Sequence, residues 1–326
     1  MPENNKNTNA LTAALVPGIL SGVIVVIMSV SLAALVFSGR LAGHIADGIA
    51  LAINTAIIAG LGIAFFSSCK PVISIVDEDT APVFALLASF VVAALPVTAT
   101  GDQLFITAVA AIVFTTMIGG IGLFLLGVFR FGNFIQFLPH SVMGGYFAAV
   151  GWLLVIGGLK VSSGLTLSSW DAVQALVDEE RLVRWLPAIA ISLILFGLRK
   201  RVSSTVLMPA TVFAALVVWH AVQAYLGVSP TDAMRDNLLI GPFGDESARL
   251  LKPMAGIDFD IVNWGALFSN VGTVASVFLI AVMSMMLSIS GLGFLTRTEP
   301  DMNSELKVAG LANMASGFGG GMIGLP

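Results

Sequence analysis

The amino-acid sequence predicts an all-α integral membrane protein that crosses the bilayer many times. Of its 326 residues, 57% are hydrophobic and only 10% are charged, and the mean hydropathy is +0.98. Soluble domains carry about 25% charged residues, so this chain could not cover a water-facing surface of its size. Several apolar runs reach the roughly 20 residues that a helix needs to cross the hydrocarbon core. Barrel strands would instead alternate over about ten residues, and that alternation is absent.

The charges, the single cysteine and the N-terminal residues exclude nucleic-acid binding, a disulfide framework and a signal peptide. The net charge is -4, and the basic residues form no stripe that would bind nucleic acid. One cysteine, Cys69, cannot form an internal disulfide and is interpreted as a buried packing residue near a helix end. Residues 1–10 form a polar tail, and the apolar run that follows is longer than a signal-peptide core of about 7–15 residues. The N-terminal run therefore predicts a first membrane span.

Seven apolar runs predict full membrane spans, of which the fifth is short and ends at basic residues. In chain order they are Val16–Phe37, Ile45–Phe66, Leu104–Phe129, Phe134–Leu159, Trp185–Leu198, Val206–Tyr225 and Val274–Leu295. A shorter run, Pro82–Leu95, predicts a half-helix. A last run, Leu306–Ile323, is broken by Gly310, Gly317, Gly319, Gly320 and Gly321.

Two long polar segments, Lys160–Arg184 and Gly227–Asn263, predict extramembrane loops. The basic cluster Arg199–Arg201 lies beside a short loop, where the positive-inside rule is strongest. With the N-terminus inside, the basic residues that fall outside lie mostly in the two long acid-rich loops, where that rule is weakest. The charges therefore favour a cytoplasmic N-terminus.

The most informative stretch runs from Ser67 to Pro82. Pro71 discourages continuation of the preceding helix, and the β-branched residues from Val72 to Val76 favour extended backbone. Pro82 suits the first turn of a new helix, and Asp79 or Thr80 is a suitable N-cap. A strand leading into a half-helix is typical of the discontinuous helices of transporters.

The start of such a half-helix can hold an anion, because its free N–H groups and positive dipole end face the ligand. The alternative interpretation is an ordinary cytoplasmic loop, in which Asp77, Glu78 and Asp79 are solvated. These three acids would repel an anion unless they are protonated, paired with a base such as Lys70, or turned away.

The second segment rich in helix breakers runs from Gly310 to Pro326. Its glycines allow helices or a ligand to approach the backbone closely, and close helix packing is the simpler interpretation for each of them. A membrane protein seldom ends at a glycine-rich break, so we expect the chain to be truncated.

Three motifs together resemble those of the SulP anion permeases, and the resemblance extends along the whole chain. The stretch Ile75–Val83 resembles the family's first half-helix, and Phe137–Tyr146 resembles F-[LI]-P-x-x-V-x-G-G-[FY]. Asn303–Gly317 resembles N-x-E-L-x-x-x-G-L-A-N-x-x-S-G, and the glycine pair Gly319-Gly320 follows it. The step Ser290-Gly291-Leu292 is similar to that of a bacterial branch, which implies the cell (inner) membrane.

The resemblance implies a seven-plus-seven inverted-repeat transporter fold, here truncated in the second repeat. Residues 11–226 would form the first seven-segment repeat, 227–266 an extramembrane loop, and 267–326 the start of the second repeat. The family's features further imply a cytoplasmic STAS domain, a homodimer and elevator-type alternating access, in which a core domain moves against a gate domain.

Carried over residue by residue, the resemblance places Thr80, Ala81, Pro82 and Asp79 in half of an anion site between two facing half-helices. Many relatives have an acid where Ser284 stands, and close relatives often have Glu where Gly293 stands. The usual acid of that segment is therefore missing. Asp77, Glu78 and Ser284 are the candidates for sodium or proton coupling.

The sequence thus predicts secondary transport of a small anion such as sulfate, bicarbonate or a dicarboxylate, without a cofactor or metal centre. The alternative is a non-transporting membrane protein, either a truncated product or an interaction subunit. An intramembrane enzyme is disfavoured because His44 lies by a span end, and His140 and His220 have no companions in an H-x-x-E or H-E-x-x-H pattern.

Overall fold

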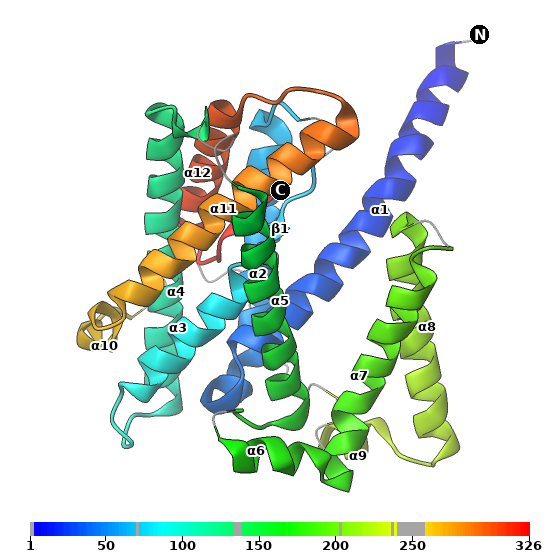
Figure 1. The fold of residues 1–326 in the computed structure, drawn as a ribbon, viewed down its shortest axis with the longest axis vertical. Helices are drawn as coiled ribbons and strands as arrows, with labels where there is room; N and C mark the ends of the chain where they lie inside the picture. Colours follow the sequence, from blue (N-terminus) through cyan, green and yellow to red (C-terminus); the bar gives the residue numbers. More distant parts are fainter. Residues whose placement is uncertain are drawn as a thin grey trace. The chain divides into compact units, whose positions relative to one another are not determined.

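The computed structural model describes residues 3–69, 72–133, 139–167, 169–201, 204–235, 238–239 and 258–326. These residues are predominantly helical (Figure 1). The chain divides into two compact units. The first contains Met1–Ile24 and Gly158–Asp245, and the second contains Val25–Gly157 and Glu246–Pro326.

The elements up to the fourth long helix are α1 (Glu3–Val36), the 3₁₀ helix η1 (Gly39–His44), α2 (Ile45–Phe66), β1 (Ile75–Val76), α3 (Ala81–Ala93) and α4 (Gly101–Val128). They are followed by α5 (His140–Ser163), α6 (Trp170–Gln174), the 3₁₀ helix η3 (Ala175–Val177), α7 (Glu179–Leu198), α8 (Ser204–Tyr225) and α9 (Pro230–Arg235). The last are α10 (Trp264–Phe268), α11 (Val271–Thr296), α12 (Met302–Phe318) and β2 (Gly324–Leu325).

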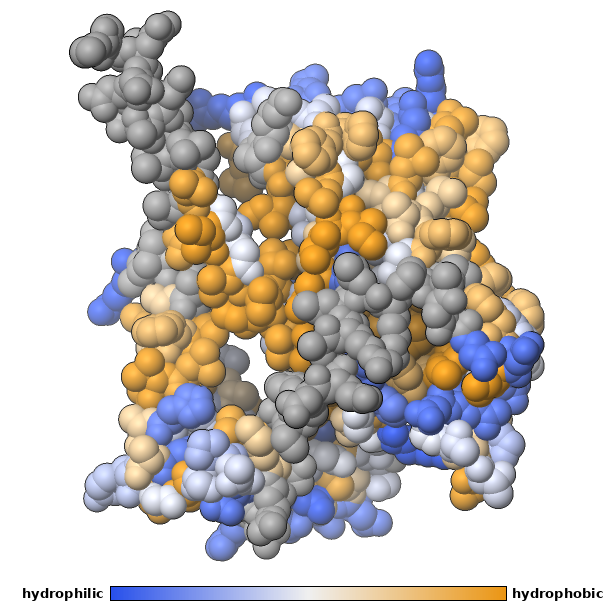
Figure 2. Space-filling model, turned by 180° about the vertical axis from the view of Figure 1, so that it is seen from behind, coloured by the Kyte–Doolittle hydropathy of each residue, from blue (hydrophilic) through white to orange (hydrophobic). Residues whose placement is uncertain are grey.

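Six of the described helices are long and apolar enough to cross a membrane. They cover Pro17–Val36, Gly39–Phe66, Gly101–Val128, Ser141–Ser163, Arg181–Leu198 and Val271–Thr296. Many of their large apolar side chains are exposed, as Leu193 and Leu279 illustrate. Figure 2 shows the same exposure of hydrophobic side chains on the visible face. Because water would penalise this surface, the exposure fits a lipid environment and confirms the predicted membrane protein.

Close helix contact in the second unit depends on glycine. Helix α12 packs along α4 (Figure 1), and a Cβ atom on Gly310 would lie 2.5 Å from the backbone nitrogen of Phe124. On the opposing face, a Cβ atom on Gly120 would lie 2.7 Å from the backbone nitrogen of Met314. The two backbones can approach this closely only because both positions lack a side chain.

The break predicted within Leu306–Ile323 is displaced toward the C-terminus. Gly310 and Gly317 lie inside the continuous helix α12, and the chain leaves the helix only after Phe318. The two glycines serve packing against α4, so the prediction that they interrupt the helix is wrong. Gly320, with φ of +82°, is in the left-handed region that favours glycine, and it turns the chain toward β2.

Two other helices begin earlier than their apolar runs. Helix α1 begins at Glu3 and so includes most of the predicted polar tail, and α7 begins at Glu179, before the run that starts at Trp185. Backbone hydrogen bonds need no apolar side chain, so hydropathy marks the membrane-crossing part of a helix and not its end. Part of the predicted run Phe134–Leu159 lies outside the described residues, and α5 is described from His140.

Helix α3 confirms the predicted half-helix. Its 13 residues extend about 20 Å, which is short of the roughly 30 Å hydrocarbon core. The guanidinium of Arg40 donates from Nη1 to the carbonyl of Val92 at 3.2 Å, near the end of the helix. This cation satisfies a terminal carbonyl and complements the negative end of the helix dipole.

Candidate functional site

The candidate site is built where β1 passes into α3. Ile75 and Val76 pair with Leu325 and Gly324 of β2 in an antiparallel ladder. The Asp77 N–H continues the ladder by donating to the carbonyl of Ile323 at 2.9 Å. The extended backbone predicted from the β-branched residues before α3 is therefore confirmed, and its pairing partner is supplied by the far end of the chain.

Side chains hold β2 in place beside β1. The Asn313 amide donates to the carbonyl of Gly324 at 2.9 Å and accepts from the Gly324 N–H at 2.7 Å. Ser316 donates to the carbonyl of Met322, and Thr55 of α2 accepts from the Met322 N–H. Because Asn313 and Ser316 are fully buried, these bonds satisfy backbone groups that no water reaches. Asn313, Ser316 and Thr55 were absent from the predicted site.

Thr80, one of the two predicted candidates, occupies the N-cap position of α3, but the capping side chain is that of Asp77. The Asp77 carboxylate accepts from the Thr80 N–H at 2.9 Å, and its carbonyl accepts from the Ala81 N–H at 3.1 Å. Thr80 does precede α3, but its side chain makes no capping bond, and its hydroxyl donates to the Asp77 carbonyl. The extra turn over residues 78–80 stays outside the regular helix because Pro82 has no N–H to donate to Glu78.

The second oxygen of Asp77 connects the half-helix to α11. The Ser284 hydroxyl donates to Asp77 Oδ1 at 2.6 Å, and both side chains are buried. Asp77 and Ser284, two predicted site residues that are 207 positions apart in the chain, are thus in direct contact. Both oxygens of this carboxylate accept from neutral donors, which lowers the cost of burying it.

The other two acids differ in their surroundings. The Tyr146 hydroxyl of α5 donates to Asp79 Oδ2 at 2.6 Å. Glu78 is exposed and Asp79 is partly exposed, whereas Thr80, Ala81 and Pro82 are buried. Tyr146 belongs to a motif noted in the sequence, yet it was not assigned to the site. The motif tolerates Phe or Tyr, so only the position of the hydroxyl in the fold identifies it.

The first turn of the half-helix has two free donors. Among the described residues, no acceptor is found for the N–H groups of Glu78 and Asp79. These are the first two positions after the capping Asp77, and a helix leaves such groups without partners of its own. Lys70, the base suggested to neutralise the acids, lies outside the described residues.

A second buried carboxylate lies near the ends of α2 and α12. Glu305 accepts from the Ser67 hydroxyl at 2.8 Å and from the hydroxyl and N–H of Ser68 at 2.6 and 2.8 Å. Glu305 is only 1% exposed, so these donors replace water around its charge. Cys69, beside this contact, is buried as predicted.

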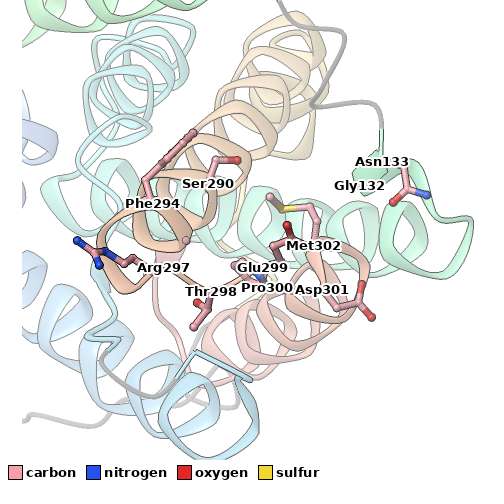
Figure 3. A pocket seen from close by; sticks show the side chains of 11 residues that line it. Gly132, Asn133, Ser290, Phe294, Arg297, Thr298, Glu299, Pro300, Asp301 and Met302 are labelled. Atoms are coloured by element: carbon pink, nitrogen blue, oxygen red, sulfur yellow. The ribbon is translucent and has the colours of Figure 1, made fainter.

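A separate hollow of about 900 Å³ lies beside the connection between α11 and α12 (Figure 3). Ser290, Gly293 and Phe294 of α11 line it, together with Arg297, and none of the predicted site residues does. A Cβ atom on Gly293 would lie 3.0 Å from both Thr298 O and Pro300 Cδ. A side chain at position 293 would therefore crowd the connection between α11 and α12.

Comparison with known proteins agrees with this architecture. The transmembrane domain of a cyanobacterium bicarbonate transporter, BicA, superposes with a TM-score of 0.65 at 20% identity, over 95% of this chain and 74% of that one. The vacuolar basic amino acid transporter VSB1 of Saccharomyces cerevisiae is 22% identical over 221 residues. That match covers 67% of this chain but only 21% of the yeast protein, so the chain spans about a fifth of that relative.

The likeness to BicA concerns the fold alone. A match to a protein family concerns the sequence itself and shows which family the chain belongs to. The features that define the candidate site, from the β1–α3 junction to the β2 strand, fall within the matched residues 11–325. That match covers nearly the whole sequence, and the chain therefore belongs to the Sulfate permease family of membrane transporters.

Proposed function

We propose that this chain forms part of a secondary transporter that carries a small anion, such as sulfate, bicarbonate or a dicarboxylate, across the cell (inner) membrane. The observation that carries the proposal is the pair of free N–H groups on Glu78 and Asp79 at the start of α3. Two adjacent N–H groups at the positive end of a helix are suited to an anionic oxygen. Membership of a transporter family supports the same function.

In this proposal the predicted site residues have distinct roles. Thr80, Ala81 and Pro82 form the buried start of the half-helix, and Asp79 borders its open side. Asp77 aligns the first turn, because it holds the Thr80 N–H while Ser284 fixes its other oxygen. The Asp77 carboxylate is the candidate for sodium or proton coupling, with Glu78 and Ser284 beside it, since an ionisable group buried at membrane depth is costly without a function.

The remaining features extend the proposal to the full-length gene product. Elevator-type alternating access requires the half-helix to move as a unit, and the β1–β2 pairing and Asp77 bonds would keep its first turn intact. An inverted repeat is supported by the antiparallel pairing of two extended segments from distant parts of the chain. A homodimer and a cytoplasmic N-terminus belong to the same proposal.

A second substrate class is favoured by the acids at the open side of the site. An amino acid presents a carboxylate, which suits the free N–H groups, and an ammonium group, which suits the carboxylates of Glu78 and Asp79. The yeast relative is named as a transporter of basic amino acids, which supports this candidate.

Uptake into proteoliposomes containing the full-length gene product distinguishes these candidates. Radiolabelled sulfate, bicarbonate, succinate, lysine and arginine are offered with a sodium gradient, with a proton gradient and with neither, against protein-free liposomes. Uptake of sulfate, bicarbonate or succinate supports the anion proposal, and uptake of lysine or arginine alone replaces it with the second. If none is taken up, the non-transporting alternative is favoured.

A further inference from the structure

Among the described residues, one side-chain hydrogen bond links α5 to the start of the half-helix. The Tyr146 hydroxyl lies 2.6 Å from Asp79 Oδ2 and 3.5 Å from the carbonyl of Ile280 in α11. A phenol has one proton to donate, so the shorter bond to the carboxylate receives it. The hydroxyl therefore donates to a carboxylate at the border of the proposed site, and hydrogen bonds to a charged acceptor are strong.

This part of α5 belongs to the second unit, and its residues make few other buried contacts with the rest of that unit. Between Ser141 and Gly157, only Val150 and Gly157 are buried. Gly157 receives the side chain of Leu35, since a Cβ atom there would lie 2.4 Å from Leu35 Cδ1. Among the described side chains of α5, only Tyr146 forms a hydrogen bond to another element. The apolar contacts place the helix, and the Tyr146 hydroxyl selects one oxygen of Asp79.

The orientation of Asp79 matters because of its position in the turn. Its own N–H and that of Glu78 are the free donors, so its carboxylate is close to any ligand that binds there. A freely rotating carboxylate would repel an anion or attract a cation at that position. A carboxylate held by Tyr146 has a fixed location and a partly compensated charge.

We propose that Tyr146 is a positioning residue, which sets the affinity for substrate by holding the Asp79 carboxylate. The inference rests on the proposed function, because it places the ligand at the start of α3. Tyr146 acts through Asp79, and its hydroxyl therefore has no effect on affinity once the carboxylate is removed.

A double-mutant cycle in the full-length protein tests this dependence. Tyr146→Phe, Asp79→Ala and the double variant are reconstituted, and KM and Vmax are measured for the substrate that the wild type carries. Alanine is used because the amide oxygen of Asn could still accept from the Tyr146 hydroxyl. Loss of a hydrogen bond to a charged group predicts that Y146F changes KM by about tenfold while Vmax stays within about twofold. KM rises for an anionic substrate and falls for a cationic one. In the D79A background, where the acceptor is absent, the same change leaves KM unaltered.

Tyr225→Phe is the matched control, because it removes the same hydroxyl group from a residue outside the site. Tyr225 is 92% exposed at the end of α8. The inference is overturned if Y146F shifts KM equally with and without the Asp79 carboxylate, since Tyr146 would then act through packing. An unchanged KM in Y146F overturns it as well. Monodispersity on size exclusion shows that each variant is folded.

A thermal-unfolding cycle on the same four proteins separates this inference from the proposed function. If the wild type carries none of the substrates offered, the proposed function fails, while non-additive melting temperatures still support the Tyr146–Asp79 bond. If the wild type transports and both cycles are additive, the inference fails and the proposed function stands.

Discussion

At the scale of single residues, the half-helix depends on one carboxylate with two tasks. Asp77 Oδ2 accepts from the Thr80 N–H and Oδ1 accepts from the Ser284 hydroxyl. The first bond supplies the capping contact that the Thr80 side chain does not make, and the second joins the start of α3 to α11.

Replacing Asp77 with Asn tests its charge separately from its shape. The amide oxygen of Asn can still accept from the Thr80 N–H, so we expect D77N to fold and to reach the membrane in normal amounts. The titratable group is lost, and we expect gradient-driven uptake to fall about tenfold, to the rate without a gradient. Ser284→Ala is the control, because it removes one donor and leaves the charge. Retention of gradient dependence in D77N would exclude Asp77 as the coupling residue.

Glu305 shows how a buried acid can serve stability. Glu305→Ala would leave the hydroxyls of Ser67 and Ser68 and the Ser68 N–H without their acceptor. Ser67 is buried, and an unsatisfied buried donor costs about 1–3 kcal/mol, whereas water can reach the exposed Ser68. We therefore expect the apparent melting temperature in detergent to fall by a few degrees. Glu305→Gln keeps an acceptor oxygen and should lose less. Equal melting temperatures for E305A and wild type would show that the contact contributes nothing to stability.

At the scale of elements, the contact between α4 and α12 holds the scaffold on which β2 is presented. The glycines at this contact face backbone atoms, which cannot move aside as a flexible side chain can. The same helix α12 carries Asn313 and Ser316, which bind the backbone of residues 322 and 324. One face of α12 therefore sets its distance from α4, while its polar side chains fix the strand that pairs with β1.

Gly310→Ala is the smallest change that tests this contact. The added Cβ atom would lie 2.5 Å from the Phe124 backbone nitrogen, so α12 must shift and we expect little monodisperse protein on size exclusion. Gly291→Ala in α11 is the control, because no atom lies within 4 Å of its added Cβ and alanine favours helix by about 1 kcal/mol. Normal yield and stability of G310A would contradict the close packing of the two helices.

The sequence predicted these elements best where a local signal exists. Pro82 and the β-branched residues before Asp77 indicated a strand followed by a half-helix, and both are present. Thr80 occupies the N-cap position, as one of the two predicted candidates, but the sequence did not identify Asp77 as the capping side chain. The missing N–H of Pro82 and the β1 pairing place the Asp77 carboxylate at this turn. Hydropathy likewise marked where α7 is apolar but not where it begins.

The site was less predictable because its contacts join residues that are far apart in the chain. The bonds from Ser284 to Asp77 and from Ser67 to Glu305 span 207 and 238 residues, and no local pattern specifies such partners. Tyr146 could be noted in a motif, but its bond to Asp79 needs the relative placement of α5 and α3. The tertiary packing of the helices, and no local sequence pattern, therefore determines which of these polar residues form hydrogen bonds with one another.

At the scale of the whole molecule, the positive-inside rule makes an orientation prediction that one helix can test. Helix α7 lies between the loop that carries Asp171 and the basic cluster at Arg199–Arg201, so the two loops must face opposite sides if α7 crosses the membrane. In a full-length Cys69→Ala background, we expect D171C to react with a membrane-impermeant maleimide on intact cells. We expect K200C to react only after permeabilisation. Both original side chains are exposed, so burial would not mask either result. Labelling of K200C alone on intact cells would reverse the orientation, and labelling of both would show that α7 does not span the bilayer.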